Sequence, residues 1–240
     1  MTEQRLQKVL AAAGIDSRRK CEELILSGVV RVNRKLVDKL PTFVDPEKDV
    51  ITVNGKKIRA ARKVYFLLNK PKGVICTNSD PQGRKKAIDL VHAPERIFCV
   101  GRLDADTTGI IILTNDSEFA NRLTHPRYGL AKTYVVGIKG QITGEQIEKL
   151  KKGIWLAEGK TGKASVKILK RGYRESSIGV TIRQGLNRQV RRMLAKVGLS
   201  VKSLKRTQIG KLNARGLGVG KSRQLSKNEV AYLRKATNSA

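Results

Sequence analysis

Apolar residues near the start of the chain recur at the spacing of a helix. Leu6, Val9, Leu10 and Ala13 are three or four residues apart, and Gly14 can end the helix that they predict. A helix with one apolar stripe of this kind must pack against a partner. The first segment therefore belongs to a folded unit with a core of its own.

Further elements of the same unit follow directly. A second helix is predicted with Asp16 or Ser17 as its cap and Gly28 at its end. Two short β segments come next, at 29–32 and 50–53, and the Asn-Gly pair after the second is a typical hairpin turn. This order predicts two helices followed by a small sheet.

A basic linker at 60–63 separates this unit from the rest, so we expect one domain over 1–62 and a second over 63–240. Strands of the second domain are predicted at 65–68, 74–76, 110–114, 132–138, 163–169 and 177–183, with a turn at 69–73. Helices are predicted at 118–123, after the capping box of Thr143 and Gln146, at 190–197, and after the capping box of Ser226 and Glu229. The fold class is α+β, with a mixed, mainly antiparallel sheet and flanking helices in the larger domain.

The net charge of the chain indicates which class of partner it binds. The chain has 50 Lys and Arg against 20 Asp and Glu, a formal net charge of +30. Residues 181–240 hold 15 basic side chains and one acid, Glu229. Such an unbalanced field indicates a polyanion partner, since phosphate contacts supply most non-specific affinity for nucleic acid. Aromatic residues make up only 4% of the chain, which argues against single-strand binding that depends mainly on base stacking.

Other classes are disfavoured by composition. The strongest apolar run, 110–113, is far shorter than the roughly 18 residues of a membrane helix. The N-terminus lacks the pattern of a secretory signal, and three scattered cysteines do not suggest a disulfide framework. Two histidines, His92 and His125, make a zinc site improbable. We expect a cytoplasmic protein without a metal.

The first turn of the second helix carries three cations, Arg18, Arg19 and Lys20. The helix dipole disfavours positive charge there by roughly 0.3–1 kcal/mol per residue. A phosphate backbone lying across this end would reverse the sign of that effect. The alternative is an ordinary solvated helix end.

The N-terminal segment resembles the S4 RNA-binding domain, in which two helices and a small sheet grip structured RNA. The resemblance lies in 3–14, in Ser17-Arg18-Arg19 and in 28–33, and it covers about the first 50 residues. It implies RNA binding. Arg5, Lys8 and Arg31 are further basic residues of this unit that we expect to contact RNA.

One acidic residue stands out in the second domain. Asp104 precedes the most apolar strand, with Arg102 two residues before it and Thr107 and Thr108 after it. A carboxylate in an RNA-binding cleft repels phosphate, so its presence suggests a specific task. The alternative is that Asp104 caps a turn.

A resemblance decides between these alternatives. The segment 101–109 and the Leu-Thr-Asn-Asp stretch at 113–116 resemble the catalytic signature of the pseudouridine synthases that act on small- and large-subunit rRNA. Four more segments resemble motifs of that family, in the same order along the chain: Asn69-Lys70-Pro71-Lys72-Gly73, Lys132-Thr133-Tyr134, the arginine motif 185–193, and 204–210. Two departures are present. Gln184 and Leu186 replace an acid and a base of the arginine motif, and Ser117 replaces a glycine.

The resemblance implies an isomerisation that needs no cofactor and no metal. Asp104 would be the catalytic carboxylate, acting either as a nucleophile at C1′ of the ribose or as a base at C2′. Arg191 would be the cation beside it, and Tyr134 would lie against the flipped base. Alternatives remain: Arg188 or Arg192 as the cation, Asp106 or Asp116 as the carboxylate, Tyr134 as an ordinary strand aromatic, and His125 as a structural residue.

The implied partner is ribosomal RNA, bound at a stem-loop by a monomer. The N-terminal segment favours large-subunit (23S) rRNA, with small-subunit (16S) rRNA or a non-catalytic assembly factor as alternatives. The expected RNA-binding residues are Arg5, Lys8, Arg18, Arg19, Lys20, Arg31, Arg102, Thr107, Lys132, Asn187, Arg188, Arg192 and Arg206.

Overall fold

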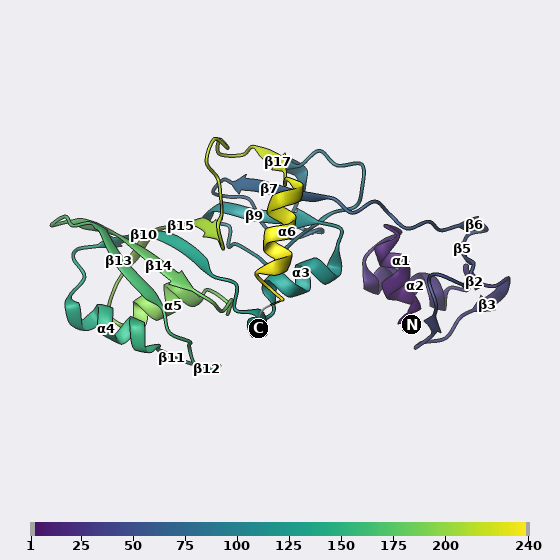
Figure 1. The fold of residues 1–240 in the computed structure, drawn as a ribbon, viewed down its shortest axis with the longest axis horizontal. Helices are drawn as coiled ribbons and strands as arrows, with labels where there is room; N and C mark the ends of the chain where they lie inside the picture. Colours follow the sequence, from purple (N-terminus) through teal and green to yellow (C-terminus); the bar gives the residue numbers. More distant parts are fainter. Residues whose placement is uncertain (1–2, 239–240) are drawn as a thin grey trace. The chain divides into compact units, whose positions relative to one another are not determined.

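A computed structural model describes residues 3–238 of the chain. The chain forms two compact units (Figure 1). The first comprises the residues up to Val64 together with Ala93–Ile97 and Asn115–Ser117. The second comprises Tyr65–His92, Phe98–Thr114 and the chain from Glu118 onwards.

The first unit contains the two predicted helices and a small sheet. Its elements are β1 (Gln4–Arg5), α1 (Leu6–Ala12), α2 (Arg18–Leu26), β2 (Val30–Val32), β3 (Lys35–Val37), β4 (Phe43–Val44), β5 (Ile51–Val53) and β6 (Lys56–Lys57). The sheet has the order β3-β2-β5-β6, and β1 pairs with β4. Leu6, Leu10, Cys21 and Ile25 are fully buried in the core between the helices and the sheet.

Local signals determine these elements. Ser17 is the cap of α2, because its hydroxyl accepts a hydrogen bond from the amide of Lys20. Asn54 and Gly55 both have positive φ angles, as the tight turn between β5 and β6 requires. Asn33 and Arg34 form a turn with the same signs of φ, which creates the unpredicted strand β3.

The second unit is built on a nine-stranded sheet with the order β13-β14-β10-β15-β9-β7-β17, to which β16 and β8 add at β15 and β9. Its elements are β7 (Tyr65–Lys70), η1 (Ala87–Leu90), β8 (Phe98–Cys99), β9 (Thr108–Thr114), α3 (Ser117–Thr124), η2 (Pro126–Tyr128), β10 (Lys132–Lys139), α4 (Gly144–Lys152), β11 (Trp155–Leu156), β12 (Gly159–Lys160), β13 (Ser165–Lys170), β14 (Glu175–Ile182), α5 (Gln189–Lys196), β15 (Val201–Ile209), β16 (Leu212–Asn213), β17 (Ser222–Gln224) and α6 (Lys227–Lys235).

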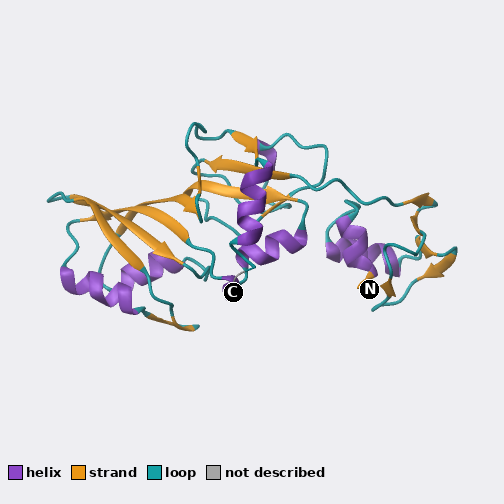
Figure 2. Cartoon of the chain, viewed as in Figure 1, coloured by secondary structure: helices purple, strands orange, loops and turns teal. Residues whose placement is uncertain are grey.

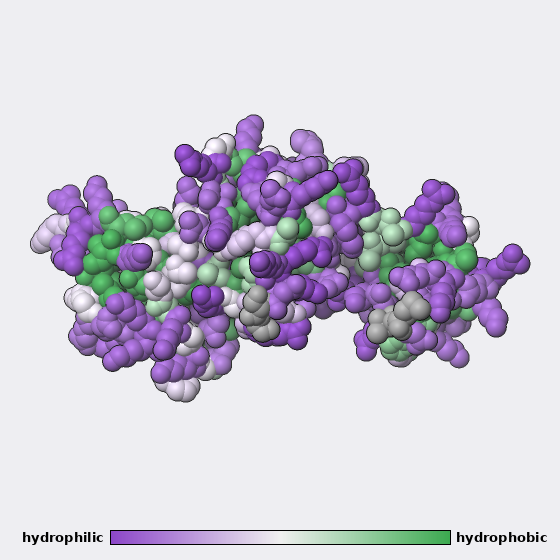
Figure 3. All heavy atoms as spheres, viewed as in Figure 1, coloured by the Kyte–Doolittle hydropathy of each residue, from purple (hydrophilic) through white to green (hydrophobic). Residues whose placement is uncertain are grey.

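The helices cover the two ends of this sheet separately. Figure 2 shows α4 and α5 beside the β10–β13–β14 end, and α3 and α6 beside β7 and β9. Phe119 and Leu123 of α3 and Leu233 of α6 join Ile110 and Ile112 of β9 in one buried cluster. On the face seen in Figure 3, hydrophilic side chains predominate and apolar side chains gather over β13 and β14. Among the described residues no helix is long and apolar enough to cross a membrane.

The two halves of the sheet meet at one short parallel junction. β15 pairs with β9 through Lys205 with Thr108 and Arg206 with Gly109, whereas the other strand pairs in the described sheet are antiparallel. Gly109 has a φ of +102°, and a Cβ there would lie 2.1 Å from the carbonyl oxygen of Arg206. The close approach therefore requires glycine at this position.

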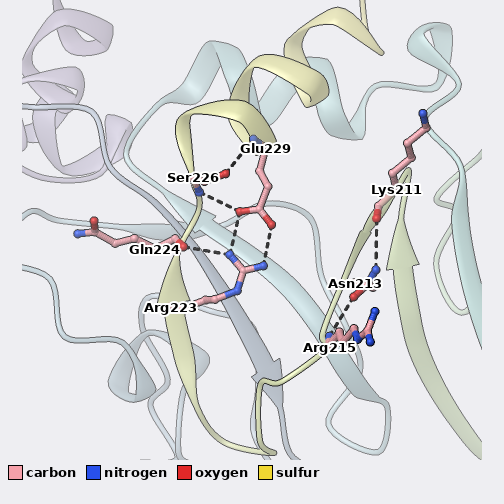
Figure 4. A network of polar contacts seen from close by, with 7 residues as sticks. All are labelled: Lys211, Asn213, Arg215, Arg223, Gln224, Ser226 and Glu229. Carbon is pink, nitrogen blue, oxygen red and sulfur yellow. Dashed lines mark hydrogen bonds and ion pairs between the residues drawn. The ribbon is translucent and has the colours of Figure 1, made fainter.

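The last helix is tied to the edge of the sheet. Ser226 and Glu229 form the predicted capping box of α6, and the Glu229 carboxylate also accepts hydrogen bonds of 2.8 and 2.7 Å from Arg223 in β17 (Figure 4). The Arg223 guanidinium holds the pKa of Glu229 below its usual range. Glu229 therefore links α6 to β17 and also accepts a hydrogen bond from the backbone at the start of α6.

The α+β class and the mainly antiparallel sheet are confirmed, as are the predicted helices. The strand expected at 74–76 is wrong, because only Ile75 makes an isolated bridge, with Lys86. The turn expected at 69–73 begins later, since β7 continues through Lys70. The hairpin β11–β12 was not predicted, because its two-residue strands are too short to show a pattern.

Candidate active site

Asp104 lies on the loop between β8 and β9, which we call the catalytic loop (residues 100–107). The amide of Thr107 donates to the carbonyl of Asp104 at 3.0 Å and closes a turn. A second hydrogen bond to this loop comes from the segment after β7, where the amide of Gly73 donates to the carbonyl of Ala105 at 2.7 Å. The amide of Leu103 also donates to the thiol Sγ of Cys76 at 3.4 Å. The loop is therefore held by Gly73, from the expected turn, and by Cys76, from the segment in which a strand was expected.

A buried lysine organises that supporting segment. Lys70 is 0% exposed, and its ammonium donates to the carbonyls of Pro71 at 3.1 Å and Val74 at 2.6 Å. Burial lowers the pKa of Lys70, while Asp104 and Asp106 act in the opposite direction. The segment around Lys70 was interpreted as a turn and as a family motif, but no role was assigned to Lys70 itself. The resemblance of that motif to the family was the available signal.

Two arginines face the two carboxylates of the catalytic loop. The guanidinium Nη1 of Arg188 lies 3.1 Å from Oδ2 of Asp104 and 3.7 Å from Oδ1 of Asp106. Nη2 of Arg191 lies 2.9 Å from Oδ2 of Asp106. The expectation that Arg191 is the cation beside Asp104 therefore does not match the geometry. Arg188, the alternative named from the sequence, makes that contact.

The start of α5 explains this difference. Arg188 is the residue before the helix and adopts the left-handed conformation, with φ 47° and ψ 31°. This conformation is uncommon for a residue with a side chain. It places Arg188 on the side of the catalytic loop, while Arg191 lies within the first turn of α5. Arg191 is also more enclosed, since its side chain is 14% exposed against 46% for Arg188.

A cavity of about 140 Å³ opens beside Asp104. It is lined by residues of the catalytic loop, of β10, of β15 and of the arginine motif. Five of the residues expected in the site from sequence, besides Asp104 and Arg188, line it: Arg102, Thr107, Lys132, Tyr134 and Arg206. Apolar walls are provided by Leu103, Ile112, Ile182, Leu186, Val190 and Leu204. The lining suits a largely apolar group that carries a few polar atoms.

Tyr134 and Arg206 lie opposite each other on β10 and β15. Tyr134 is 8% exposed. Arg206 is 3% exposed, and its Nε donates to the carbonyl of Ile110 at 2.8 Å. Its Nη2 has no hydrogen-bond partner among the described residues. Arg206 was expected to contact RNA. Because it is buried, it does not hold a phosphate at the protein surface. Its Nη2 remains available as a hydrogen-bond donor at the cavity.

Lys132 also enters the cavity wall from β10. Its ammonium has one contact, with the carbonyl of Leu130 at 3.4 Å. Burial, with a smaller contribution from Arg206, lowers the pKa of Lys132 to about 8. The cavity thus holds a lysine whose charge is poorly solvated in the free protein.

The remaining residues expected to bind RNA lie outside the cavity. Arg192 donates to the Glu158 carboxylate at 2.8 Å and to the carbonyl of Asn187 at 3.1 Å, so it holds neighbouring protein segments. In the first unit the side chains of Arg5, Lys8, Arg18, Arg19 and Arg31 belong to exposed residues. Lys20 is exposed too, but its ammonium pairs with Glu23 at 2.7 Å.

Two other sequence-based expectations concern acids and cysteines. Neither rival carboxylate lines the cavity: Asp116 is only 5% exposed, and Asp106 faces Arg188 and Arg191. Within residues 3–238 no cluster of three metal-ligating side chains is found. Cys21, Cys76 and Cys99 are free.

The buried charge of Lys132 yields a stability prediction. Lys132→Met should raise the free energy of unfolding at pH 7 by on the order of 2 kcal/mol, because the folded protein no longer holds an ammonium with a depressed pKa. The wild-type penalty is full below about pH 8, where both states carry the charge, and it is lost as pH rises through the ordinary pKa of 10.5, above which both states are neutral. The gain should therefore shrink over that window in urea unfolding. Lys160→Met, at an exposed position, is the control; a gain that is equal at about pH 7 and about pH 10 contradicts the assignment.

Comparison with known proteins shows the family of the chain. The model of the RNA pseudouridylate synthase family matches residues 64–196, and the S4 domain model matches residues 4–51. Ribosomal large subunit pseudouridine synthase B of Bacillus subtilis is 49% identical over 234 residues, which are 96% of each chain. An uncharacterized RNA pseudouridine synthase of Aquifex aeolicus is 41% identical over 98% of this chain and 96% of its own.

Solved structures agree as well. A crystal structure of a pseudouridylate synthase, 28% identical, superposes with a TM-score of 0.70 and covers 95% of this chain and 99% of its own. The family model covers more than half of the chain, and the relatives match it almost from end to end. The chain therefore belongs to the RNA pseudouridylate synthase family, with a pseudouridine synthase domain preceded by an S4 domain.

Proposed function

We propose that this enzyme converts a uridine of large-subunit (23S) ribosomal RNA to pseudouridine, with Asp104 as the catalytic carboxylate. The observation that carries the proposal is the position of Asp104 at a cavity that Tyr134 and Arg206 also line, with a guanidinium 3.1 Å from its carboxylate. The assignment to 23S rRNA rests on the printed names of relatives, foremost the Bacillus subtilis protein.

The reaction breaks the N1–C1′ bond of uridine, turns the uracil ring and joins its C5 to C1′. The proton on C5 is lost and one returns to N1, so atoms and electrons balance without a co-reactant. The carboxylate acts at the ribose, either by attack on C1′ or by removal of the C2′ proton. Both roles require the ionised form. Arg188 places a guanidinium 3.1 Å from this carboxylate.

The other polar groups of the cavity then have distinct tasks. Tyr134 packs against the flipped uracil ring. Arg206 offers its unpaired Nη2 as a donor to the developing charge on a uracil carbonyl. Lys132 meets the phosphate of the target nucleotide, which restores the solvation that its ammonium lacks in the free protein. Arg191 acts through Asp106 and positions the catalytic loop.

RNA binding precedes this chemistry. The target uridine must leave its stack, at a cost of a few kcal/mol, and Arg102 enters the space that it vacates. A stem-loop lowers this cost because its bases are partly unpaired. The exposed cations of the S4 domain, Arg18 and Arg19 above all, grip the phosphate backbone. We further propose that the enzyme acts as a monomer in the cytoplasm.

Substitution at Asp104 tests the catalytic assignment. Asp104→Asn should abolish pseudouridine formation on an rRNA transcript and leave RNA affinity within a few-fold, because it removes charge but little volume. Asp106→Asn is the matched control and should be much milder. Tritium release from 5-[³H]uridine RNA measures turnover. Near wild-type turnover by the Asp104→Asn protein rules the assignment out.

The two arginines can be separated in the same assay. Arg188→Gln should lower turnover roughly ten- to a hundredfold, the effect of losing a charged hydrogen bond to the reacting carboxylate. Arg191→Gln should have a smaller effect, because its partner is Asp106. The reverse order would indicate that Arg191 replaces Arg188 beside Asp104 once RNA is bound.

The choice of ribosomal RNA is tested in cells. Pseudouridine mapping of both rRNAs in a strain that lacks this protein should show one or more missing modifications in 23S rRNA and none in 16S rRNA. Expression of the wild-type protein should restore them, and the Asp104→Asn protein should not. Loss from 16S rRNA instead would assign small-subunit specificity, and unchanged maps would favour an assembly factor.

A further inference from the structure

The only tryptophan of the chain is exposed. Trp155 begins the β11–β12 hairpin, and 70% of its surface is accessible. A large aromatic side chain contributes most to stability or to binding when its surface is buried. The indole borders a shallow hollow on the surface of the second unit, lined by Trp155, Leu156, Ala157, Arg192, Ala195 and Lys196.

The exposure is not due to a loosely held segment. The amide of Ile154 donates to the Thr161 hydroxyl at 2.9 Å, and the amide of Thr161 donates back to the carbonyl of Ile154 at 2.9 Å. A Cβ at Gly153 would lie 2.3 Å from the carbonyl oxygen of Thr161, so the base of the hairpin is tightly closed. The fold therefore presents the indole to solvent in a defined position.

The hairpin is also attached to the arginine motif. Glu158, between its two strands, accepts from Arg192 at 2.8 Å, and this contact holds the pKa of Glu158 well below its usual range. The amide of Gly162 donates to the side-chain oxygen of Gln184 at 2.8 Å, which gives this departure from the family motif a structural role. The amide of Arg192 donates to the carbonyl of Arg188 at 3.0 Å, and Arg188 contacts Asp104.

The charges around the indole indicate which class of ligand the surface binds. Lys196 lines the same hollow, and Lys152 and Lys160 are exposed on the adjoining elements. No ion pair links these three lysines to an acid in the described residues, whereas Arg192 is already paired. A flat apolar ring beside uncompensated cations matches a nucleobase and its phosphate. An apolar or acidic protein surface would use only one of these two features.

We propose that Trp155 and Lys196 form an accessory RNA-binding site, in which the indole stacks on a base and the ammonium contacts a phosphate. The bound nucleotide lies outside the catalytic cavity, on the strand that leads to or from the target uridine. Stacking is tolerant of sequence, so this site strengthens binding without selecting a base. The inference rests on the proposed RNA substrate, but its test needs no turnover.

Fluorescence reports on the site directly because the emission of the chain's single tryptophan comes from Trp155. Titration of the wild-type protein with a 23S rRNA stem-loop transcript should quench and shift this emission. Heparin, a polyanion without bases, should compete for the cations and quench far less. Quenching by RNA would stand even if no pseudouridine were formed, so this result is independent of the proposed reaction.

Variants measure the contribution to affinity. Trp155→Ala should weaken binding of the transcript roughly five- to a hundredfold, the range for loss of one stacked base, and Trp155→Phe should retain most of the affinity. Lys196→Gln should weaken binding modestly and reduce the salt slope by about 1. Tyr173→Ala, at a residue that is 90% exposed, is the matched control and should change nothing.

Two outcomes overturn the proposal. One is emission that RNA leaves unchanged, together with full affinity in the Trp155→Ala protein; the exposed ring would then belong to a contact with another protein. The other is an equal loss of affinity in the Tyr173→Ala control, which would mean that any exposed aromatic has the same effect.

Discussion

The active site depends on the close approach of two parallel strands at Gly109. Arg206 pairs with this glycine, and the junction is the place where the two halves of the nine-stranded sheet join. A side chain at position 109 would collide with the carbonyl of Arg206. Because the approach is so close, the catalytic loop of one half comes to lie against Tyr134 and Arg206 of the other.

Charged side chains around the catalytic loop then fix its position and surround its two carboxylates. Lys70 lies below the loop without any exposure, and its hydrogen bonds hold the segment that in turn anchors Ala105. Above it, Arg188 and Arg191 face Asp104 and Asp106. Asp104 is thus held at a defined position among many cations, in a chain whose positive charge otherwise suits the binding of phosphate.

The sequence was informative wherever a single residue determines local geometry. The caps at Ser17, Thr143 and Ser226 and the turn at Asn54 could be predicted because each satisfies nearby backbone groups or supplies a positive φ. The family motifs brought Asp104 and Tyr134 into one site. The partner of Asp104 could not be predicted, since it depends on where α5 begins.

Other features could not be predicted because long-range packing decides them. The burial of Lys70 depends on strands far apart in the chain, and no local pattern distinguishes this lysine from the exposed Lys72 nearby. The segment 74–76 has the composition of a strand, but the backbone of Ile75 bonds to residues 85–87 and the thiol of Cys76 contacts the catalytic loop. The hairpin that exposes Trp155 is too short to leave a periodic signal.

The conformation of Arg188 has a consequence for how the enzyme tolerates change. Its left-handed backbone costs on the order of 1 kcal/mol relative to glycine, which adopts the same angles freely. The chain nevertheless keeps a guanidinium there, so backbone stability and the proposed contact with Asp104 place opposite demands on this position. Directed evolution for heat resistance alone should favour its replacement, and the product would be a more robust protein with lower turnover.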